Sequence, residues 1–360
     1  MKISIVLGTR PEIIKMSSII RELEEQHSDY FVLHTGQHYS YNLDKIFFEE
    51  LDLPAPSCNL DVGSGSHAEE IGKMFVGLEK KLGAEKPDVV LVQGDTNTVF
   101  AGAFVASRLG IGIGHVEAGL RSFDRNMPEE INRVLTDHIS DYLFAPTETA
   151  QKYLLKEGIP LDKIFITGNT IVDAVHQNVE IAKRKVDVLN SLELNSHDYM
   201  LVTSHRQENV DNEKKLRDIF KGLHLVYEQF GQMLLYPMHP RTMKRMKEFG
   251  LQVPEGIRIV EPVGFLEFLQ LEANASLILT DSGGIQEESC ILGVPCVTLR
   301  ENTERPETIT VGSNVLVGTD PQKILDGAVK MFSSEKKWEN PYGGGETGKK
   351  ILDILQGALE

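Results

Sequence analysis

The chain has 360 residues, of which 41% are hydrophobic and 25% charged, and its formal net charge is −16. One hydrophobic core rarely grows beyond about 250 to 300 residues, so we expect two domains. The acidic balance argues against a nucleic-acid partner, which needs a basic face. No apolar run reaches the roughly 18 residues of a membrane span. The sequence starts with a strand-like run and not with the apolar region and cleavage site of a signal peptide, so we expect a cytoplasmic protein.

Short apolar runs alternate with longer helical patterns through the first half of the chain. The runs that predict strands are 3–7, 31–34, 89–93, 111–116, 142–145 and 164–167. Apolar residues at helical spacing predict helices at 13–25, 67–82, 98–108 and 128–140. The strand runs are almost continuously hydrophobic, which is typical of strands buried on both faces of a parallel sheet. This alternation predicts a doubly wound α/β domain.

The same alternation returns in the second half, with predicted strands at 199–203, 233–237, 257–260, 277–280 and 295–299. The stretch 172–196 is more polar, so we place the domain change near Gly168. We therefore expect an α/β fold with two Rossmann-like doubly wound domains, 1–168 and 169–346, facing a central cleft. A C-terminal helix, 347–360, is expected to join the first domain.

The motif GTRPE, from Gly8 to Glu12, follows the first predicted strand. Gly8 permits a tight turn, and Pro11 suits the first position of a helix. A helix N-terminus favours an anion, and Arg10 and Lys15 add positive charge. Because the motif is neither GxGxxG nor GxxxxGK[ST], phosphate binding and an ordinary strand–helix turn both stay open.

Three acids, Asp95, Glu117 and Glu129, follow later strand-like runs. Asp95 and Glu129 also suit helix capping, whereas Glu117 stands between an apolar run and small residues, where a carboxylate is costly without a partner or a task. Carboxylates that converge on one site suit general acid–base catalysis. The competing functional hypothesis is a metal site. We expect no metal, because neither these acids nor the three cysteines show ligand spacing, although a carboxylate-only Mg²⁺ site stays open.

The second half carries a comparable set of polar groups at strand ends. His205 and Arg206 can bind a phosphate, and His239 has a similar position; a surface loop is the alternative for all three. The turn Ser282-Gly283-Gly284 predicts backbone N–H donors for a pyrophosphate. A carboxylate one turn further along the helix, where Glu287 and Glu288 lie, can accept hydrogen bonds from the two hydroxyls of a ribose.

As an ordered set, these motifs resemble the non-hydrolysing UDP-N-acetylglucosamine 2-epimerase family over nearly the whole chain. The matching motifs read GTRPE, GDTNT, HVEAGLR, PEEINR, FITGNTIVDA, DSGGIQEE, GVPCVTLRENTERPE and NPYG. The resemblance implies the two-lobe fold of nucleotide-sugar glycosyltransferases. It also implies reversible conversion of UDP-GlcNAc to UDP-ManNAc by elimination of UDP, a 2-acetamidoglucal intermediate and re-addition. The resemblance further implies that the protein needs no cofactor, is cytoplasmic, binds UDP as a product and forms a homodimer.

Carried over residue by residue, the resemblance assigns chemistry to Asp95, Glu117, Glu129 and His205. It assigns substrate binding to Arg10, Lys15, Arg133, Ser282, Gly283, Gly284 and Glu288. Arg206 and His239, from their positions at strand ends, and Arg305 are further expected substrate-binding residues. Bacterial members bind a second UDP-GlcNAc as an activator; Gln37 and His38 match that segment, but no Arg occurs between Asp52 and Glu70. Weak or absent substrate activation is therefore expected.

Three other activities remain compatible with the motifs. The first is a hydrolysing epimerase that releases UDP and ManNAc, and the second is an epimerase of a UDP-linked diacetamido uronic acid. From a different class, a non-catalytic nucleotide-sugar sensor is disfavoured because the three acids and His205 are all present.

Overall fold

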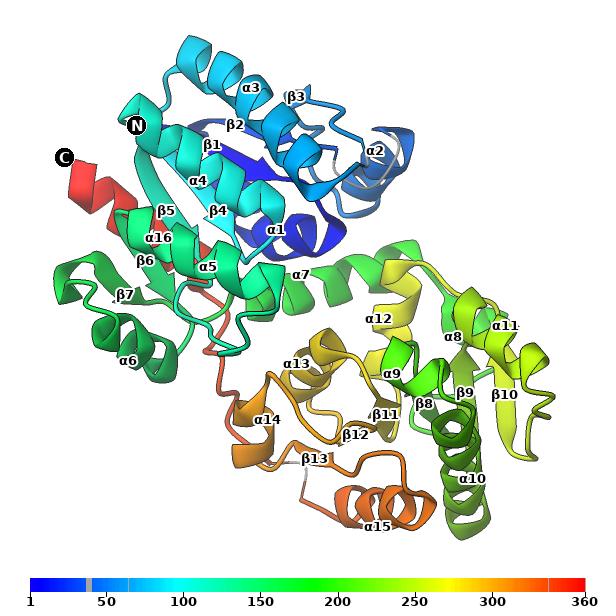
Figure 1. Cartoon of the computed structure of the whole chain (residues 1–360). Helices are drawn as coiled ribbons and strands as arrows, with labels where there is room; N and C mark the ends of the chain where they lie inside the picture. The colour runs from blue at the N-terminus through cyan, green and yellow to red at the C-terminus, as the bar shows by residue number, and fades with distance from the viewer. Residues whose placement is uncertain (37–40, 64, 336, 360) are drawn as a thin grey trace. The chain divides into compact units, whose positions relative to one another are not determined.

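The computed structural model describes residues 1–36, 41–63, 65–335 and 337–359. The chain forms two compact units (Figure 1): unit 1 is Met1–Gln177 with Tyr342–Glu360, and unit 2 is Asn178–Pro341. The division falls inside helix α7 (Thr170–Lys185), not at Gly168, because an unbroken helix carries the chain from one unit into the other.

Unit 1 contains a parallel sheet in the order β3-β2-β1-β4-β5-β6-β7. Its strands are β1 (Lys2–Leu7), β2 (Asp29–His34), β3 (Cys58–Asn59), β4 (Val89–Gln93), β5 (Gly112–Val116), β6 (Tyr142–Ala145) and β7 (Ile164–Ile166). Its helices, besides the first part of α7, are α1 (Arg10–Glu25), α2 (Tyr41–Glu50), α3 (His67–Glu85), α4 (Asn97–Leu109), α5 (Pro128–Ile139), α6 (Glu148–Lys156), a 3-10 turn (Leu161–Lys163) and α16 (Thr347–Leu359).

Unit 2 contains a second parallel sheet, in the order β10-β9-β8-β11-β12-β13. Its strands are β8 (Tyr199–Thr203), β9 (Met233–Pro237), β10 (Ile257–Val260), β11 (Ile278–Thr280), β12 (Cys296–Thr298) and β13 (Asn314–Leu316). Its helices, besides the end of α7, are α8 (Val188–Ser191), α9 (Gln207–Val210), α10 (Glu213–Phe230), α11 (Pro240–Glu248), α12 (Phe265–Ala273), α13 (Gly283–Leu292), α14 (Pro306–Thr310) and α15 (Pro321–Phe332).

The predicted α/β fold with two doubly wound parallel sheets is confirmed. The predicted strands appear within one or two residues of their expected ends, and most of their residues are buried and apolar. The sequence analysis missed β3 and β13, which have two and three residues and are therefore too short to show a pattern. Among the described residues, no helix is both long and apolar enough to cross a membrane.

Local signals explain where the helices begin and end. α4 begins after Thr96, whose hydroxyl accepts a hydrogen bond from the Val99 amide at 3.4 Å. It ends at Gly110, which adopts the left-handed conformation (φ 69°) that glycine tolerates best. α16 returns to unit 1 and packs against α1, and the Gly348 amide donates to Asp173 at 3.3 Å.

Both sheets have a topological switch point at their centre. β1 lies between β2 and β4, and β8 lies between β9 and β11, so successive connections run to opposite sides of the first strand. In doubly wound folds, ligands bind at the carboxyl ends of the strands flanking such a point. The loops after β1 and β4 in unit 1, and after β8 and β11 in unit 2, are therefore the places to look for a site.

Candidate active site

Glu12 occupies the switch point of unit 1. The backbone N–H groups of Gly8 and Thr9 donate to one oxygen of its carboxylate at 2.6 and 2.9 Å, and the Thr96 hydroxyl donates to the other oxygen. Burial raises the pKa of Glu12 to about 7; the hydrogen bonds oppose this shift and Asp95 adds to it. The chain's own carboxylate thus occupies these two N–H donors, which favours an ordinary strand–helix turn over a phosphate site at Gly8 and Thr9.

Glu117 is a buried carboxylate just beyond β5. Its backbone lies in the left-handed region (φ 71°), which is uncommon for a residue with a side chain. Lys15 of α1 donates to both of its oxygens, at 2.7 and 2.8 Å, and the Gln93 side-chain amide at the end of β4 donates to one of them. The structure thus brings two predicted residues, Lys15 and Glu117, together, and adds Gln93, which the sequence analysis missed.

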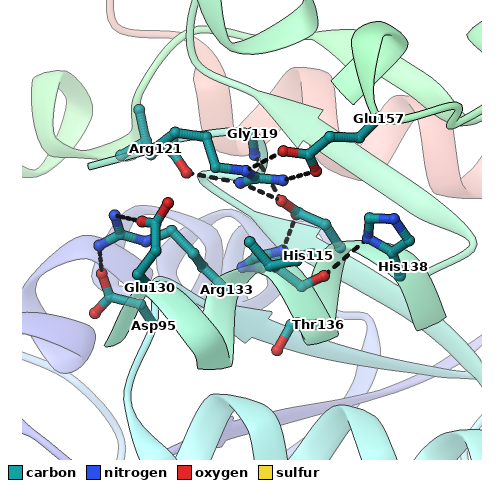
Figure 2. A network of polar contacts seen from close by, with 12 residues as sticks. Asp95, His115, Gly119, Arg121, Glu130, Arg133, Thr136, His138 and Glu157 are labelled. Carbon is teal, nitrogen blue, oxygen red and sulfur yellow. Dashed lines mark hydrogen bonds and ion pairs between the residues drawn. The ribbon is translucent and has the colours of Figure 1, made fainter. Parts of the chain in front are cut away.

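Asp95 follows β4 and is about one-third exposed, with 31% of its side chain accessible. It forms an ion pair with Arg133 of α5, and the other end of that guanidinium donates to Glu130 at 2.8 Å. The predicted residues Asp95 and Arg133 therefore meet. Figure 2 shows Arg133 between the two carboxylates.

The adjacent acids Glu129 and Glu130 have different surroundings. Glu130 is buried and accepts hydrogen bonds from the Ser122 amide, the Ser122 hydroxyl and the Phe123 amide at 2.9 to 3.0 Å. Burial favours the neutral acid, but these hydrogen bonds and Arg133 together hold the pKa of Glu130 below its ordinary value. Glu129 is exposed. The exposed Glu129 is not one of the two carboxylates that Arg133 pairs with, Asp95 and Glu130.

A second buried network lies beside these acids (Figure 2). His115 of β5 contacts Asp137 of α5 at 2.6 Å, and Asp137 contacts the Arg121 guanidinium at 2.7 Å. Arg121 also donates to Glu157 at 2.6 and 2.8 Å. Burial opposes ionisation of Asp137, yet His115 and Arg121 hold its pKa below the ordinary value.

The Arg10 guanidinium lies 5.4 Å from the centre of the Phe47 ring. That distance is within the range of a cation–π contact.

Gln37 and His38, predicted as a regulatory pair, lie outside the described residues.

Asp281, which follows β11 and is completely buried, organises the switch point of unit 2. Its carboxylate accepts hydrogen bonds from the Ser204 hydroxyl at 2.8 Å, the Arg206 amide at 3.1 Å and the Asn209 side chain at 3.0 Å. The His205 amide donates to it at 3.1 Å. One buried carboxylate thus fixes the loop that presents His205 and Arg206.

The side chain of His205 is 47% exposed, and its ring lies 6.3 Å from that of His239, measured between centroids. Partial burial lowers the pKa of His205; Asp281 opposes this shift, and His239 and Arg206 add to it. Arg206 Nη2 lies 4.0 Å from a carboxylate oxygen of Glu304. These three predicted residues lie at neighbouring strand ends of unit 2.

The turn after β11 offers fewer backbone donors than expected. The Ser282 amide donates to the Thr280 hydroxyl at 2.9 Å, so it is already engaged. Gly283 and Gly284 begin α13, where the first N–H groups of a helix have no partner within the helix. These two amides are the better candidates for an anion.

Each of the two neighbouring acids of α13 has a defined partner. Glu287 forms an ion pair with the predicted residue Arg305 at 2.7 Å. Glu288 is hydrogen-bonded to Glu272, a buried acid of α12 that the sequence analysis missed. Burial, followed by the neighbouring Glu288, raises the pKa of Glu272 well above its ordinary value.

Within the described ranges, no group of three or more His, Cys, Asp or Glu residues could hold a metal ion. The residues that the sequence analysis missed share one property: their partners are distant in the sequence. Glu12 is the exception, because an acid three residues after Thr9 is a recognisable capping signal.

The comparisons with known proteins agree over almost the entire length. The family model described as UDP-N-acetylglucosamine 2-epimerase matches residues 21–356. The chain is 59% identical over 362 residues to UDP-N-acetylglucosamine 2-epimerase of Methanocaldococcus jannaschii, with 99% of each chain covered. It is 57% identical over 362 residues to the enzyme of that name from Methanococcus maripaludis, covering 99% of this chain and 98% of the relative.

A solved structure supports the same grouping. The M. jannaschii UDP-GlcNAc 2-epimerase in complex with UDP-GlcNAc and UDP is 58% identical, with a TM-score of 0.86 and 99% coverage of both chains. The chain therefore belongs to the UDP-N-acetylglucosamine 2-epimerase family.

Proposed function

We propose that this protein reversibly inverts C2 of UDP-GlcNAc to give UDP-ManNAc. The relative with 59% identity is named a UDP-N-acetylglucosamine 2-epimerase, and a similar solved structure contains UDP-GlcNAc and UDP. The observation that carries the proposal is the placement of two ion-paired carboxylates, Asp95 and Glu117, at the ends of the neighbouring strands β4 and β5.

The reaction removes one proton and one leaving group. A base takes the C2 proton, the C1–O bond breaks, and its electron pair leaves with UDP, so that C1 and C2 become doubly bonded in 2-acetamidoglucal. UDP then adds back to C1, and an acid delivers a proton to the opposite face of C2. Positive charge that develops at the sugar as UDP departs is stabilised by carboxylates.

Unit 1 supplies the acids and bases in this proposal. Asp95, Glu117 and Glu129 act on the sugar. Arg133 holds Asp95 in place, and Lys15 holds Glu117, through the ion pairs described above. A neighbouring cation favours the charged form of a carboxylate, which is the form that a general base requires. Arg10 supplies a further positive charge for the substrate.

Unit 2 binds the nucleotide in this proposal. His205, Arg206 and the amides of Gly283 and Gly284 take the pyrophosphate, and His239 and Arg305 support that end of the substrate. Glu288 takes the ribose hydroxyls, and its hydrogen bond with the buried Glu272 holds its carboxyl group in place. His205 protonates or hydrogen-bonds the departing phosphate.

Proton NMR of the purified protein with UDP-GlcNAc in D₂O tests the proposal. UDP-ManNAc carrying deuterium at C2 is the expected product, and activity should survive dialysis against EDTA because no metal takes part. Free ManNAc would indicate hydrolysis instead. A spectrum that stays unchanged with UDP-GlcNAc, and also with the UDP-diacetamido uronic acid as substrate, would contradict epimerisation and favour a sensor.

The proposal includes a homodimer formed through the face of α3 and α4. These helices lie side by side (Figure 1), and the rings of Phe75 and Phe104 are 5.0 Å apart, with Phe100 6.1 Å from Phe75. Val76 is 70% exposed and Phe104 is 39% exposed, which is unusual for apolar side chains that pack as a cluster. Light scattering should give twice the chain mass for the wild type and the monomer mass for Phe104→Asp.

A further inference from the structure

Asp137 closes the loop that contains Glu117. One of its oxygens contacts His115 Nδ1 at 2.6 Å, before Glu117 in the chain. Its other oxygen accepts from the Gly119 amide at 3.2 Å and from Arg121 at 2.7 Å, after Glu117. A single buried carboxylate therefore holds both sides of a segment whose central acid has a left-handed backbone.

His115 extends this link to Asp95. Its Nε2 lies 2.8 Å from the carbonyl oxygen of Gly94, the residue before Asp95. A carbonyl oxygen only accepts hydrogen bonds, and so does the ionised carboxylate on the other side of the ring. His115 is completely buried, so both ring nitrogens are engaged by protein oxygens and not by water.

The charges continue in alternation beyond this pair. Asp137 is negative, Arg121 positive and Glu157 negative, and the contacts run from His115 through these three residues in turn. Burying a charge is costly unless it is paired, so this sequence of contacts explains how Asp137 and Arg121 are tolerated in the interior. Only the Glu157 end is appreciably exposed among these four side chains.

We propose that the His115–Asp137 pair is a positioning device that sets Asp95 through the Gly94 carbonyl and Glu117 through the 115–121 loop. The proposal rests on the proposed function, in which these two acids act on the sugar. A displacement of about 1 Å at a reacting group can cost roughly 10²-fold in rate. Two hydrogen bonds from one rigid ring therefore hold both acids in a fixed mutual geometry.

Two substitutions separate the two hydrogen bonds. The amide nitrogen of His115→Asn stands near the position of Nδ1, so this variant keeps the bond to Asp137 and loses the one to Gly94. His115→Gln places its amide nitrogen near Nε2 and keeps the bond to Gly94 instead. The matched control is His138→Asn, an exposed histidine next to Asp137 on the same helix.

The measurements are kcat, KM for UDP-GlcNAc, UDP affinity, thermal midpoint, C2 proton exchange and release of 2-acetamidoglucal. We expect both His115 variants to lower kcat by about 10- to 100-fold, with KM and UDP affinity changed by less than about threefold. His115→Asn should share the partial-reaction profile of Asp95→Asn, and His115→Gln that of Glu117→Gln. His138→Asn should match the wild type.

Two results would overturn the positioning role: folded His115 variants with wild-type kcat, or a loss of kcat that merely follows the loss of folded protein. A wild-type protein without C2 exchange would instead defeat the proposed function, and the positioning role with it. The wild-type reaction thus separates the two failures.

Discussion

Lys15 and Glu117 form a buried ion pair that joins α1 to the loop after β5, with the ammonium 2.7 and 2.8 Å from the two carboxylate oxygens. The two residues are 102 positions apart in the chain. Because β1 leads into α1 and lies beside β4, which pairs with β5, the parallel sheet places their elements next to each other.

Lys15→Met should destabilise the protein by about 3 kcal/mol at pH 7, because it leaves the buried Glu117 without its cation. Urea denaturation measures the change, and Glu117→Gln in the same chain should restore most of it. The control is Lys214→Met, which removes an exposed partner of Asp218 and should cost no more than about 0.5 kcal/mol. Equal losses for the two single variants would contradict this account of the buried pair.

Glu129→Gln and Glu130→Gln should separate turnover from stability. Glu129→Gln, at an exposed position, is expected to lower kcat by about 10²- to 10⁴-fold with an unchanged thermal midpoint. Glu130→Gln should cost about 1 to 3 kcal/mol of stability, because its carboxylate accepts hydrogen bonds from Ser122 and Phe123. Should Glu129→Gln retain normal turnover, Glu129 would be no more than a charged residue in the first turn of α5.

Glu12→Gln should remove a pH dependence of stability. The pKa of Glu12 is about 7 in the folded state, above its ordinary value of 4.5, so the folded state binds its proton more tightly than the unfolded state. The stabilisation is complete below pH 4.5 and is lost as the pH rises through 7, by about 3 kcal/mol in total. Denaturation at pH 5, 6, 7 and 8 should show the wild type losing stability relative to Glu12→Gln as the pH rises. Parallel plots of unfolding free energy against pH for the two proteins would contradict the raised pKa of Glu12.

Glu288→Ala should weaken UDP binding by about 5- to 150-fold, which corresponds to about 1 to 3 kcal/mol for unpaired ribose hydroxyls. Titration calorimetry measures the dissociation constant, and Glu255→Ala, at an exposed position of unit 2, is the control. An unchanged dissociation constant would reject Glu288 as the ribose ligand.

Much of the fold was predictable because it depends on local patterns. A strand buried on both faces must be continuously apolar, and Val89–Gln93 and Tyr199–Thr203 are found where the sequence predicts them. Polar residues directly after such runs, such as Asp95 and His205, lie at the carboxyl ends of strands that flank a switch point. For these positions, sequence order alone determines the edge of the sheet.

The tertiary structure decided which groups meet. Glu129 and Glu130 look equivalent in the sequence, yet successive residues of a helix point about 100° apart, so one is exposed and the other is buried against Ser122. His115 and Asp137 are 22 residues apart, and no periodicity connects a strand residue to a residue of the following helix. Hydrophobic patterns act over a few residues and specify elements, whereas charge pairing depends on distances that exist only after the strands have ordered into a sheet.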